Sequence, residues 1–457
     1  MNHSDDTIAA ISTPPGEGGI GIVRLSGDDA ISWANRIFKS SSGKELTDKT
    51  RQVYYGTIWD DEECLDEVLV HVMRGPHSYT AEDVIEINGH GGSGPLNAIL
   101  EKVLTLGARL ANPGEFTQRA FLNGRIDLIQ AEAVMDRIQA RTRAGLKAAA
   151  SLATGRLSLA LFELKEQLLW SKSHIEAAVD FPDQDLPELI TPELRNKISD
   201  TLTKMKELYA TADAGRLLRE GARIAIAGKP NVGKSSLFNA LLRDSRAIVT
   251  SKAGTTRDLI EETISIDGVP VRLVDTAGIR DTQDEIEKIG VDLARTALEE
   301  SAAVLFVVDS STPLTADDEL LYNELVSQNV PILYVGNKAD LEKNWETISF
   351  AETDSKILFV SAETSFGLEH LEHAISVLLK GDFSMQGDEP MLNRLHQKDS
   401  LRRAMEAIER LQENYHESPE FMSIDINEAL EALGEITGET TPDDVLEAIF
   451  NTFCIGK

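Results

Sequence analysis

Residues 228–235 have the types and the spacing of a phosphate-binding loop. They read Gly-Lys-Pro-Asn-Val-Gly-Lys-Ser and lie between an apolar strand-like run and a predicted helix, which is the context that this motif requires. The glycines let backbone N–H groups converge on a phosphate at a helix N-terminus. Lys234 would neutralise the β- and γ-phosphates, and the Ser235 hydroxyl would bind Mg²⁺. A chance glycine-rich turn is the alternative, and the flanking strand and helix argue against it.

Two further motifs follow in the order that a GTP site requires. Residues 275–278 (Asp-Thr-Ala-Gly) end a strand-like run, so Asp275 can hold Mg²⁺ through water and the N–H of Gly278 can meet the γ-phosphate. Residues 337–340 (Asn-Lys-Ala-Asp) place the carboxylate of Asp340 where it can accept hydrogen bonds from guanine. Adenine presents the opposite pattern, so we expect discrimination against ATP by about 10⁴-fold or more.

The remaining nucleotide contacts come from two other segments. Residues 250–258 lie at the distance after the loop helix where a first switch is expected, and Thr256 is predicted to complete the Mg²⁺ shell begun by Ser235. Ser361 and Ala362 fit the loop that backs the base. The predicted GTP-binding residues are Asn231, Val232, Gly233, Lys234, Ser235, Ser236, Thr250, Ser251, Lys252, Ala253, Gly254, Thr255, Thr256, Asp275, Thr276, Ala277, Gly278, Asn337, Lys338, Asp340, Ser361 and Ala362.

The side chain that usually orients the attacking water is absent. In Ras-like proteins a glutamine directly follows the Asp-x-x-Gly motif, and here that position is Ile279. Another group must substitute, or hydrolysis is slow. Spacing alone does not choose among the acidic residues of the next turn, Asp281, Asp284, Glu285 and Glu287. Each of them could instead lie on a solvated helix face.

Length and charge restrict what these motifs can serve. The chain has 457 residues, which suggests about three domains. Its net charge of −31 excludes binding of nucleic acid through the overall field, so such a partner needs a local basic patch. The two cysteines, Cys64 and Cys454, lack metal-ligand or redox spacing. Without a basic, apolar leader or a long apolar run, the sequence predicts a cytoplasmic protein with no membrane span.

The texture of the sequence predicts the elements that position the motifs. In order we expect a small mixed domain, a helical segment, a strand–helix alternation and a second helical segment, at residues 1–121, 122–220, 221–381 and 382–457. The alternation predicts a mostly parallel sheet covered on both faces. Asp267 and Gly268 predict a hairpin to an antiparallel edge strand. The predicted fold class is α/β plus all-α, with a Ras-like P-loop domain inserted in a helical domain and preceded by a small α+β domain.

The motifs together resemble the MnmE (TrmE) family of tRNA-modification GTPases. The phosphate loop, the segment Gly-Thr-Thr-Arg-Asp at 254–258 and the motif at 275–278 match. More specific matches lie in the motifs Thr-Pro-Pro-Gly, Gly-His-Gly-Gly, Pro-Gly-Glu-Phe, Ala-Phe-Leu-Asn and Phe-Cys-Ile-Gly-Lys, at 13–16, 89–92, 113–116, 120–123 and 453–457. The resemblance covers essentially the whole chain. It implies a GTPase that helps to add a carboxymethylaminomethyl or aminomethyl group to C5 of the wobble uridine of certain tRNAs.

For the GTP site, the resemblance implies that two GTPase domains dimerise across their nucleotide faces and that K⁺ replaces an arginine finger. The implied K⁺ ligands are Asn231, Thr250, Lys252 (through its backbone carbonyl) and Thr255. Glu287 matches the family's catalytic glutamate, which positions the water. Arg257 and Arg280 are fallback candidates for the finger, and each could instead be a surface charge.

For the first domain, the resemblance implies a dimerising domain that binds 5-formyl- or methylene-tetrahydrofolate. The contacts carried over by position are Arg24, Glu86, Arg125 and Lys457. Cys454 matches a cysteine assigned to the modification chemistry, although a cysteine at this position could equally be inert. The implied partners are tRNA, a second copy of the chain and an FAD/NADH-dependent tRNA-modification protein (MnmG/GidA-like), which together with the homodimer forms a heterotetramer.

Two patterns keep two interpretations each, and for a third one interpretation is rejected. Between residues 117 and 160, seven basic residues outnumber three acidic ones, which is either a footprint for tRNA phosphates or a solvated helix face. The seven are Arg119, Arg125, Arg137, Arg141, Arg143, Lys147 and Arg156. His90 could be catalytic, although a structural role in a glycine-rich turn is favoured. Residues 16–21 match Gly-x-Gly-x-x-Gly but continue as a strand-like run, so no flavin or nicotinamide site is predicted.

Two other classes of function compete with this interpretation. The first is a ribosome-assembly or regulatory GTPase whose flanking domains only bind RNA, which would need a basic module that this acidic chain does not favour. The second is a scaffold in which GTP controls only dimerisation. That scaffold predicts unchanged wobble uridines in cells that lack the protein.

Overall fold

The computed structural model describes residues 6–46, 51–180, 191–244, 261–275, 301–348, 356–381, 389–416 and 418–457. The chain divides into two compact units. Unit 1 comprises residues 1–135, 161–190 and 406–457, and unit 2 comprises residues 136–160 and 191–405. Among the described residues, no helix combines the length and the apolar character that crossing a membrane requires.

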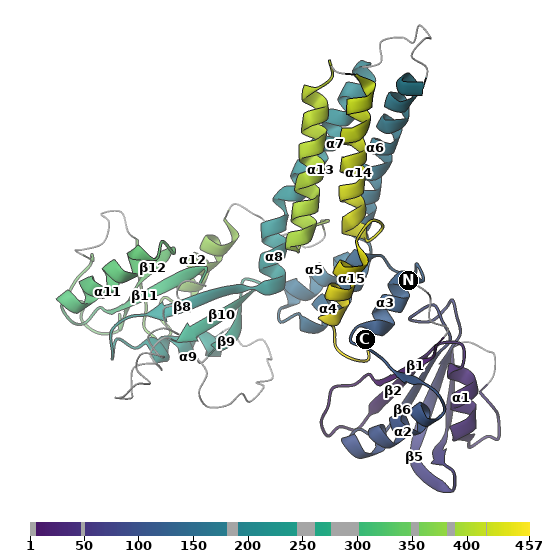
Figure 1. Ribbon diagram of the computed structural model, residues 1–457. Coiled ribbons are helices and arrows are strands. Elements are labelled where there is room, and N and C mark those ends of the chain that lie inside the picture. Colours follow the sequence, from purple (N-terminus) through teal and green to yellow (C-terminus); the bar gives the residue numbers. More distant parts are fainter. Residues whose placement is uncertain are drawn as a thin grey trace. The chain divides into compact units, whose positions relative to one another are not determined.

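A seven-stranded sheet forms the first part of unit 1 (Figure 1). Its strands lie in the order β3 (Phe38–Ser40), β4 (Gln52–Asp60), β5 (Glu63–Met73), β6 (Val84–Gly89), β2 (Gly21–Ser26), β1 (Ile8–Ile11) and β7 (Arg109–Leu110). The pair β1–β7 is parallel and the other neighbours are antiparallel. Helices α1 (Ala30–Ile37) and α2 (Ser93–Thr105) cover one face, because Ala34 and Ile99 pack against the strand residues Val23 and Ile87 in one core.

The last helix of the chain brings the final residues beside this sheet. Helix α15 (Asp443–Asn451) packs on α3 (Glu115–Leu122) and on the start of α4 (Leu128–Gln139), with the rings of Phe121 and Phe450 6.1 Å apart. The chain then meets the end of β1 at Gly456, where φ is +88° and a Cβ atom would lie 2.5 Å from the carbonyl oxygen of Ile11. Only glycine tolerates both conditions, so this residue allows the final segment to lie against the sheet.

Three longer helices complete unit 1. They are α6 (Arg156–Asp180), α13 (Leu395–Glu413) and α14 (Pro419–Thr437), and both α6 and α13 contain a boundary between the units. Within unit 1, Arg410 on α13 donates a hydrogen bond to Asp425 on α14 at 3.1 Å. Lys165 on α6 pairs with Glu439, just after α14. These ion pairs connect the three helices.

A six-stranded sheet forms the centre of unit 2 (Figure 1). Its strands lie in the order β13 (Ile357–Phe359), β12 (Ile332–Asn337), β11 (Ala303–Asp309), β8 (Ala222–Ala227), β10 (Val269–Asp275) and β9 (Glu261–Ile266). The edge strand β9 is antiparallel to β10, and the other pairs are parallel. Helices α9 (Lys234–Asp244) and α12 (Leu368–Lys380) pack on one face, and α11 (Ala316–Ser327) packs on the other. The loops that follow β8, β12 and β13 therefore meet at one edge.

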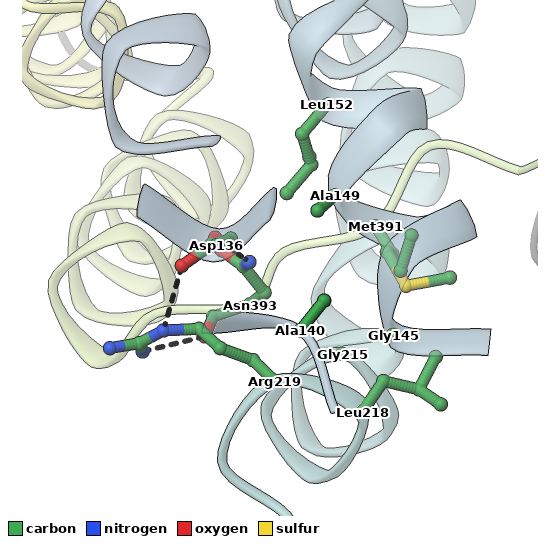
Figure 2. Close-up of a pocket in the computed structure, with 11 residues that line it drawn as sticks. Asp136, Ala140, Gly145, Ala149, Leu152, Gly215, Leu218, Arg219, Met391 and Asn393 are labelled. Carbon is green, nitrogen blue, oxygen red and sulfur yellow. Dashed lines mark hydrogen bonds and ion pairs between the residues drawn. The ribbon is translucent and has the colours of Figure 1, made fainter. Parts of the chain in front are cut away.

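A buried carboxylate joins three segments of unit 2 beside a small pocket (Figure 2). Asp136, which is 7% exposed, accepts hydrogen bonds from Nδ2 of Asn393 at 2.8 Å and from Nη2 of Arg394 at 2.9 Å. Nε of Arg219 lies 3.3 Å from the same carboxylate. Arg219 belongs to α8 (Ala212–Glu220), which follows α7 (Pro192–Ala210), and apolar residues of α8 and α5 (Arg143–Ala153) line a small pocket beside it. Asp136 thus connects α4 to the segments that precede and follow the sheet in the sequence.

The structure confirms the predicted fold class. The turn at Asp267 and Gly268 joins β10 to the antiparallel edge strand, and the run after residue 19 is strand β2 rather than a helix. Strands β3, β4 and β7 were not predicted. The predicted domain boundaries at residues 121, 220 and 381 stay predictions, because the two compact units divide the helical segments at other positions.

Candidate functional site

The loop after β8 holds a lysine against its own carbonyl groups. Lys234 begins α9, and its Nζ donates hydrogen bonds to the carbonyl oxygens of Gly228 and Lys229, both at 2.8 Å. Gly233 has a φ of +92°, and a Cβ atom there would lie 2.3 Å from Nδ2 of Asn337. Both the backbone conformation and the close approach of a second loop therefore require glycine at position 233. A loop of this shape at the N-terminus of α9 can hold a phosphate.

Asn337, the last residue of β12, connects this loop to the loop after β13. Its Nδ2 donates to the carbonyl oxygen of Val232 at 2.9 Å, and its Oδ1 accepts from the N–H of Ala362 at 3.2 Å. The side chain is buried, with the residue 2% exposed. One amide therefore uses both its donor and its acceptor to fix the spacing between the predicted phosphate loop and the predicted base loop.

Asp340 presents a carboxylate to solvent beside this connection. Its Oδ1 accepts a hydrogen bond from Oγ of Ser361 at 2.5 Å, and that hydroxyl accepts from the N–H of Thr364 at 3.2 Å. No described residue donates to Oδ2 of Asp340. An oriented carboxylate with a free oxygen suits the adjacent N–H donors of guanine.

Two lysines of these loops are paired with buried carboxylates. Nζ of Lys338 donates to Oδ2 of Asp309 at 2.6 Å. Burial acts to raise the pKa of the Asp309 carboxyl, but the hydrogen bonds from Lys338 and Ser311 outweigh it and hold that pKa below its ordinary value. Nζ of Lys229 lies 2.7 Å from Oδ2 of Asp318, which is 2% exposed at the start of α11. Each pair fixes one residue of a loop to the element behind it.

Part of the predicted nucleotide site lies outside the described residues. The strand β10 ends at Asp275, whose backbone pairs with Ile226 at the end of β8, so this residue lies at the same edge as the phosphate loop. Ser235 and Ser236 occupy the exposed first turn of α9. Outside the described residues lie Thr250, Ser251, Lys252, Ala253, Gly254, Thr255, Thr256, Arg257, Thr276, Ala277, Gly278, Arg280, Asp281, Asp284, Glu285 and Glu287.

In unit 1, two predicted folate contacts face each other across neighbouring strands. The register of β2 and β6 pairs Arg24 with Glu86. Nε and Nη2 of Arg24 lie 2.9 and 2.8 Å from Oε1 of Glu86, and Nη1 donates to the carbonyl oxygen of Gly456 at 3.0 Å. Their side chains are 12% and 18% exposed. No described residue donates to Oε2 of Glu86, which leaves that oxygen for a ligand.

The other two predicted contacts adjoin this pair. Burial and the positive charge of Arg24 lower the pKa of the Lys457 amino group, against the attraction of Glu86. Nη1 of Arg125 donates to the carbonyl oxygen of Tyr79 at 2.7 Å. The guanidinium carbons of Arg125 and Arg24 lie 5.1 and 5.4 Å from the centre of the Tyr79 ring. The structure thus brings Arg24 and Arg125 together at Tyr79, which sequence reasoning missed. An aromatic residue in a polar turn was the only signal, and it is weak.

Comparison with known proteins gives two family matches. A model described as the MnmE helical domain matches residues 128–454, and a model described as the GTP-binding protein TrmE N-terminus matches residues 7–125. The chain belongs to the MnmE family. A tRNA modification GTPase MnmE of Thermoanaerobacter pseudethanolicus is 46% identical over 99% of both chains, and that of Alkaliphilus oremlandii is 46% identical over 100% of both. That of Geotalea uraniireducens is 44% identical over 100% of both. The resemblance to MnmE inferred from the motifs is therefore confirmed.

Two further residues of this chain lie near the first sheet. Cys454 is exposed, and its backbone carbonyl oxygen accepts from the N–H groups of Gly114 and Lys457, both at 3.3 Å. His90 bonds through Nδ1 to Asp66 at 2.6 Å, and this hydrogen bond, together with the attraction of Asp66, raises the pKa of His90. The backbone N–H of His90 also donates to Asp66 at 2.7 Å. Both bonds anchor the glycine-rich turn to β5, which agrees with a structural role.

The basic residues proposed as a tRNA footprint do not all face solvent. The prediction is wrong for Arg119, whose side chain is 8% exposed and lies 2.6 Å from Asp6 and 3.1 Å from Glu82, because these carboxylates already neutralise it. Arg125 is directed to Tyr79, and Arg141 donates to Oγ1 of Thr263 at 2.5 Å. The role of the remaining members stays a prediction, for Arg137, Arg143, Lys147 and Arg156.

Proposed function

We propose that the protein is a GTP hydrolase that acts in tRNA modification, the activity that the names of its relatives state for them. The observation that carries this proposal is the buried amide of Asn337, which bonds to Val232 in the phosphate loop and to Ala362 in the base loop. Such a connection serves a ligand that has both a phosphate and a base. The orientation of Asp340 by Ser361 supports guanine as that base.

In the proposed nucleotide site each described residue has one task. Lys234 supplies positive charge at the phosphates, and Asp340 accepts hydrogen bonds from guanine. Ser235 is an exposed residue in the first turn of α9, and its hydroxyl is proposed as a Mg²⁺ ligand. Thr256 and Asp275 are proposed to complete that shell. Mg²⁺ neutralises charge on the phosphates when it is bound.

We further propose that hydrolysis depends on K⁺. Asn231 fits a K⁺ ligand because it is exposed in the loop with a φ of +66° and its amide makes no hydrogen bond to a described residue. Thr250, Lys252 and Thr255 are the other proposed ligands, and Glu287 is proposed to position the attacking water. The cation supplies the charge that an arginine finger supplies elsewhere, which is worth about 10³- to 10⁵-fold in rate.

The test compares GTP turnover in KCl and in NaCl at equal ionic strength. We expect turnover to be much faster in KCl, and N231A to lose most of that difference. Asn239 is an exposed asparagine on the adjoining helix α9, so N239A is the matched control and should keep the difference. Equal wild-type rates in the two salts would refute the K⁺ proposal.

In unit 1 we propose a site for 5-formyl- or methylene-tetrahydrofolate, held by Arg24, Glu86, Arg125 and Lys457. The residues fit, because the basic side chains suit carboxylates and the free Oε2 of Glu86 suits the donor edge of a pterin. The folate supplies a one-carbon unit when it is bound. Titration of the full-length protein with 5-formyl-tetrahydrofolate should give saturable binding, and R24L should weaken it.

We propose that the modified position is C5 of the wobble uridine, in a homodimer that works with the FAD/NADH-dependent partner as a heterotetramer. Cys454 is proposed to take part in the modification chemistry, since its segment lies beside the folate site. Mass spectrometry of tRNA nucleosides from cells with and without the protein tests this step. Loss of a modified wobble uridine supports it, whereas unchanged nucleosides favour a scaffold or a ribosome-assembly GTPase.

A further inference from the structure

Both arginines of the proposed folate site meet one aromatic ring. Tyr79 lies between β5 and β6, whereas Arg24 lies on β2 and Arg125 follows α3. The guanidinium carbons of Arg24 and Arg125 lie 5.4 and 5.1 Å from the centre of the Tyr79 ring, within the range of cation–π attraction. Arg24 also lies 5.5 Å from the ring centre of Phe116. The two arginines come from distant parts of the sequence, and the ring of Tyr79 is a contact that they share.

Several contacts fix Tyr79 itself. Its hydroxyl hydrogen-bonds with Oγ1 of Thr117, which is 0% exposed on α3, at 2.8 Å. The next residue, Thr80, bonds to Oγ of Ser26 at 2.6 Å, and its carbonyl oxygen accepts from Asn123 at 2.7 Å. The ring therefore belongs to a turn that is anchored to β2 and to α3 by contacts other than the bond that Arg125 donates to the Tyr79 carbonyl oxygen.

Holding these arginines together has an electrostatic cost that the ring offsets. Arg24 lies close enough to Lys457 for its charge to act on the lysine, and only Glu86 among the predicted contacts carries the opposite charge. The face of an aromatic ring attracts a cation without using the N–H groups of a guanidinium. Tyr79 can therefore hold both arginines while it leaves N–H donors free for an anionic ligand.

We propose that Tyr79 is a positioning residue of the folate site, whose ring holds Arg24 and Arg125 in place before the ligand arrives. This inference rests on the proposed binding of a folate. Because the long side chains are already ordered, binding does not require them to lose their freedom at that moment. Each cation–π contact at a partly exposed site corresponds to about a 2- to 5-fold change in affinity, so loss of both corresponds to about 5- to 30-fold.

The experiment measures binding of 5-formyl-tetrahydrofolate to the full-length protein by calorimetry. Y79L, which removes the ring, should weaken binding by about 5- to 30-fold. Y79F, which keeps the ring and loses only the bond to Thr117, should bind within about 2-fold of wild type. Trp59 is the matched control, because it forms a cation–π contact with Lys39 at 3.8 Å in the same sheet and touches neither arginine. W59L should leave folate affinity unchanged.

A double-mutant cycle separates positioning from a general structural effect. If Tyr79 acts through Arg125, the losses of Y79L and R125L should be less than additive, whereas a general weakening of the fold adds to the loss of the arginine. Wild-type affinity in Y79L, equal losses in Y79F and Y79L, or additive losses in the cycle would overturn the role of Tyr79. Failure of the wild-type protein to bind would instead refute the folate proposal itself, and the role of Tyr79 with it.

Discussion

Replacing Asp340 by asparagine should move base preference from guanine toward xanthine. The hydrogen bond from Ser361 to Oδ1 of Asp340 fixes which way the replaced group points. The amide oxygen of an asparagine can keep that bond, so its NH₂ group takes the place of the free Oδ2. The exchange therefore puts a donor where the acceptor for guanine stood, with almost no change of shape.

The magnitude follows from the hydrogen bonds that are lost. Guanine can donate through N1–H and its amino group to the carboxylate, and a hydrogen bond to a charged group contributes about 1.5–3 kcal/mol. The remaining amide oxygen can still accept from N1–H, so the bond lost is that of the amino group, about 1.5–3 kcal/mol, which is a fall in GTP affinity of about 10- to 10²-fold. Xanthine carries a carbonyl oxygen where guanine carries the amino group, so it can accept a hydrogen bond from the new amide.

Competition with a fluorescent guanine nucleotide gives the affinities of both triphosphates for both proteins. D340N should lose GTP affinity and gain affinity for xanthosine triphosphate. The matched control is S361A, which removes the bond that orients the carboxylate and should weaken GTP by about 10-fold without improving xanthosine triphosphate. An unchanged ratio of the two affinities in D340N would refute the placement of the base at Asp340.

Two further predictions concern buried and exposed charge. D136A should lower the free energy of unfolding by about 3–5 kcal/mol, because it removes the buried carboxylate that binds Arg394; urea unfolding measures this. D213A removes a carboxylate that is 67% exposed, so it should change the free energy of unfolding by less than about 1 kcal/mol. Equal effects of the two variants would contradict the stabilising role of the buried Asp136 carboxylate. Because Asp66 raises the pKa of His90 above 6.5, their contact contributes stability below pH 6.5 that is lost as the pH rises through the raised value. NMR titration should show the His90 pKa falling to about 6.5 in D66N, and an unshifted pKa would show that Asp66 is not its cause.

The phosphate and base motifs could be predicted because their chemistry is local in sequence. Lys234 bonds to carbonyl groups five and six residues before it, and short spacing within one loop already determines such contacts. The link from Asn337 to Val232 spans 105 residues. That bond was not predicted, but the nearness of the two loops follows because the carboxyl ends of parallel strands share an edge once the strand–helix alternation is recognised.

The first domain shows where this reasoning stops. Strand β7 has two residues and exists because it pairs with β1, so no local pattern could reveal it. Arg119 was expected at the surface because arginine is usually exposed. Its partners Asp6 and Glu82, which bury it, lie 113 and 37 residues away in the sequence. The same holds for Tyr79, whose ring meets arginines from β2 and from the chain after α3. Contacts of this kind join residues far apart in the sequence, and composition does not encode them.

The domain boundary predicted from composition differs from the boundary of the compact unit that contains the six-stranded sheet. Composition ends the helical segment at residue 220, whereas the compact unit that holds the sheet also contains residues 136–160 and 191–220. Helix α8 leads into β8 through Gly221, where φ is +77° and a Cβ atom would lie 2.4 Å from the carbonyl oxygen of Pro270 on β10. No linker separates the helix from the sheet, because the two elements touch at the point where one becomes the other.

The hairpin of β9 and β10 is likewise in direct contact with α5 and α8. A Cβ atom on Gly268, at its turn, would lie 3.0 Å from Cβ of Ala144 on α5, and Arg272 donates to the carbonyl oxygen of Glu220 on α8 at 3.3 Å. This hairpin lies between residues 245–260 and 276–300, which contain the predicted switch residues. A displacement of the hairpin would therefore change its packing on α5 and α8 directly, because close-packed elements transmit small shifts to their neighbours. Helices α5 and α8 thus pack against the sheet that carries the predicted nucleotide site, although their sequence texture assigns them to another domain.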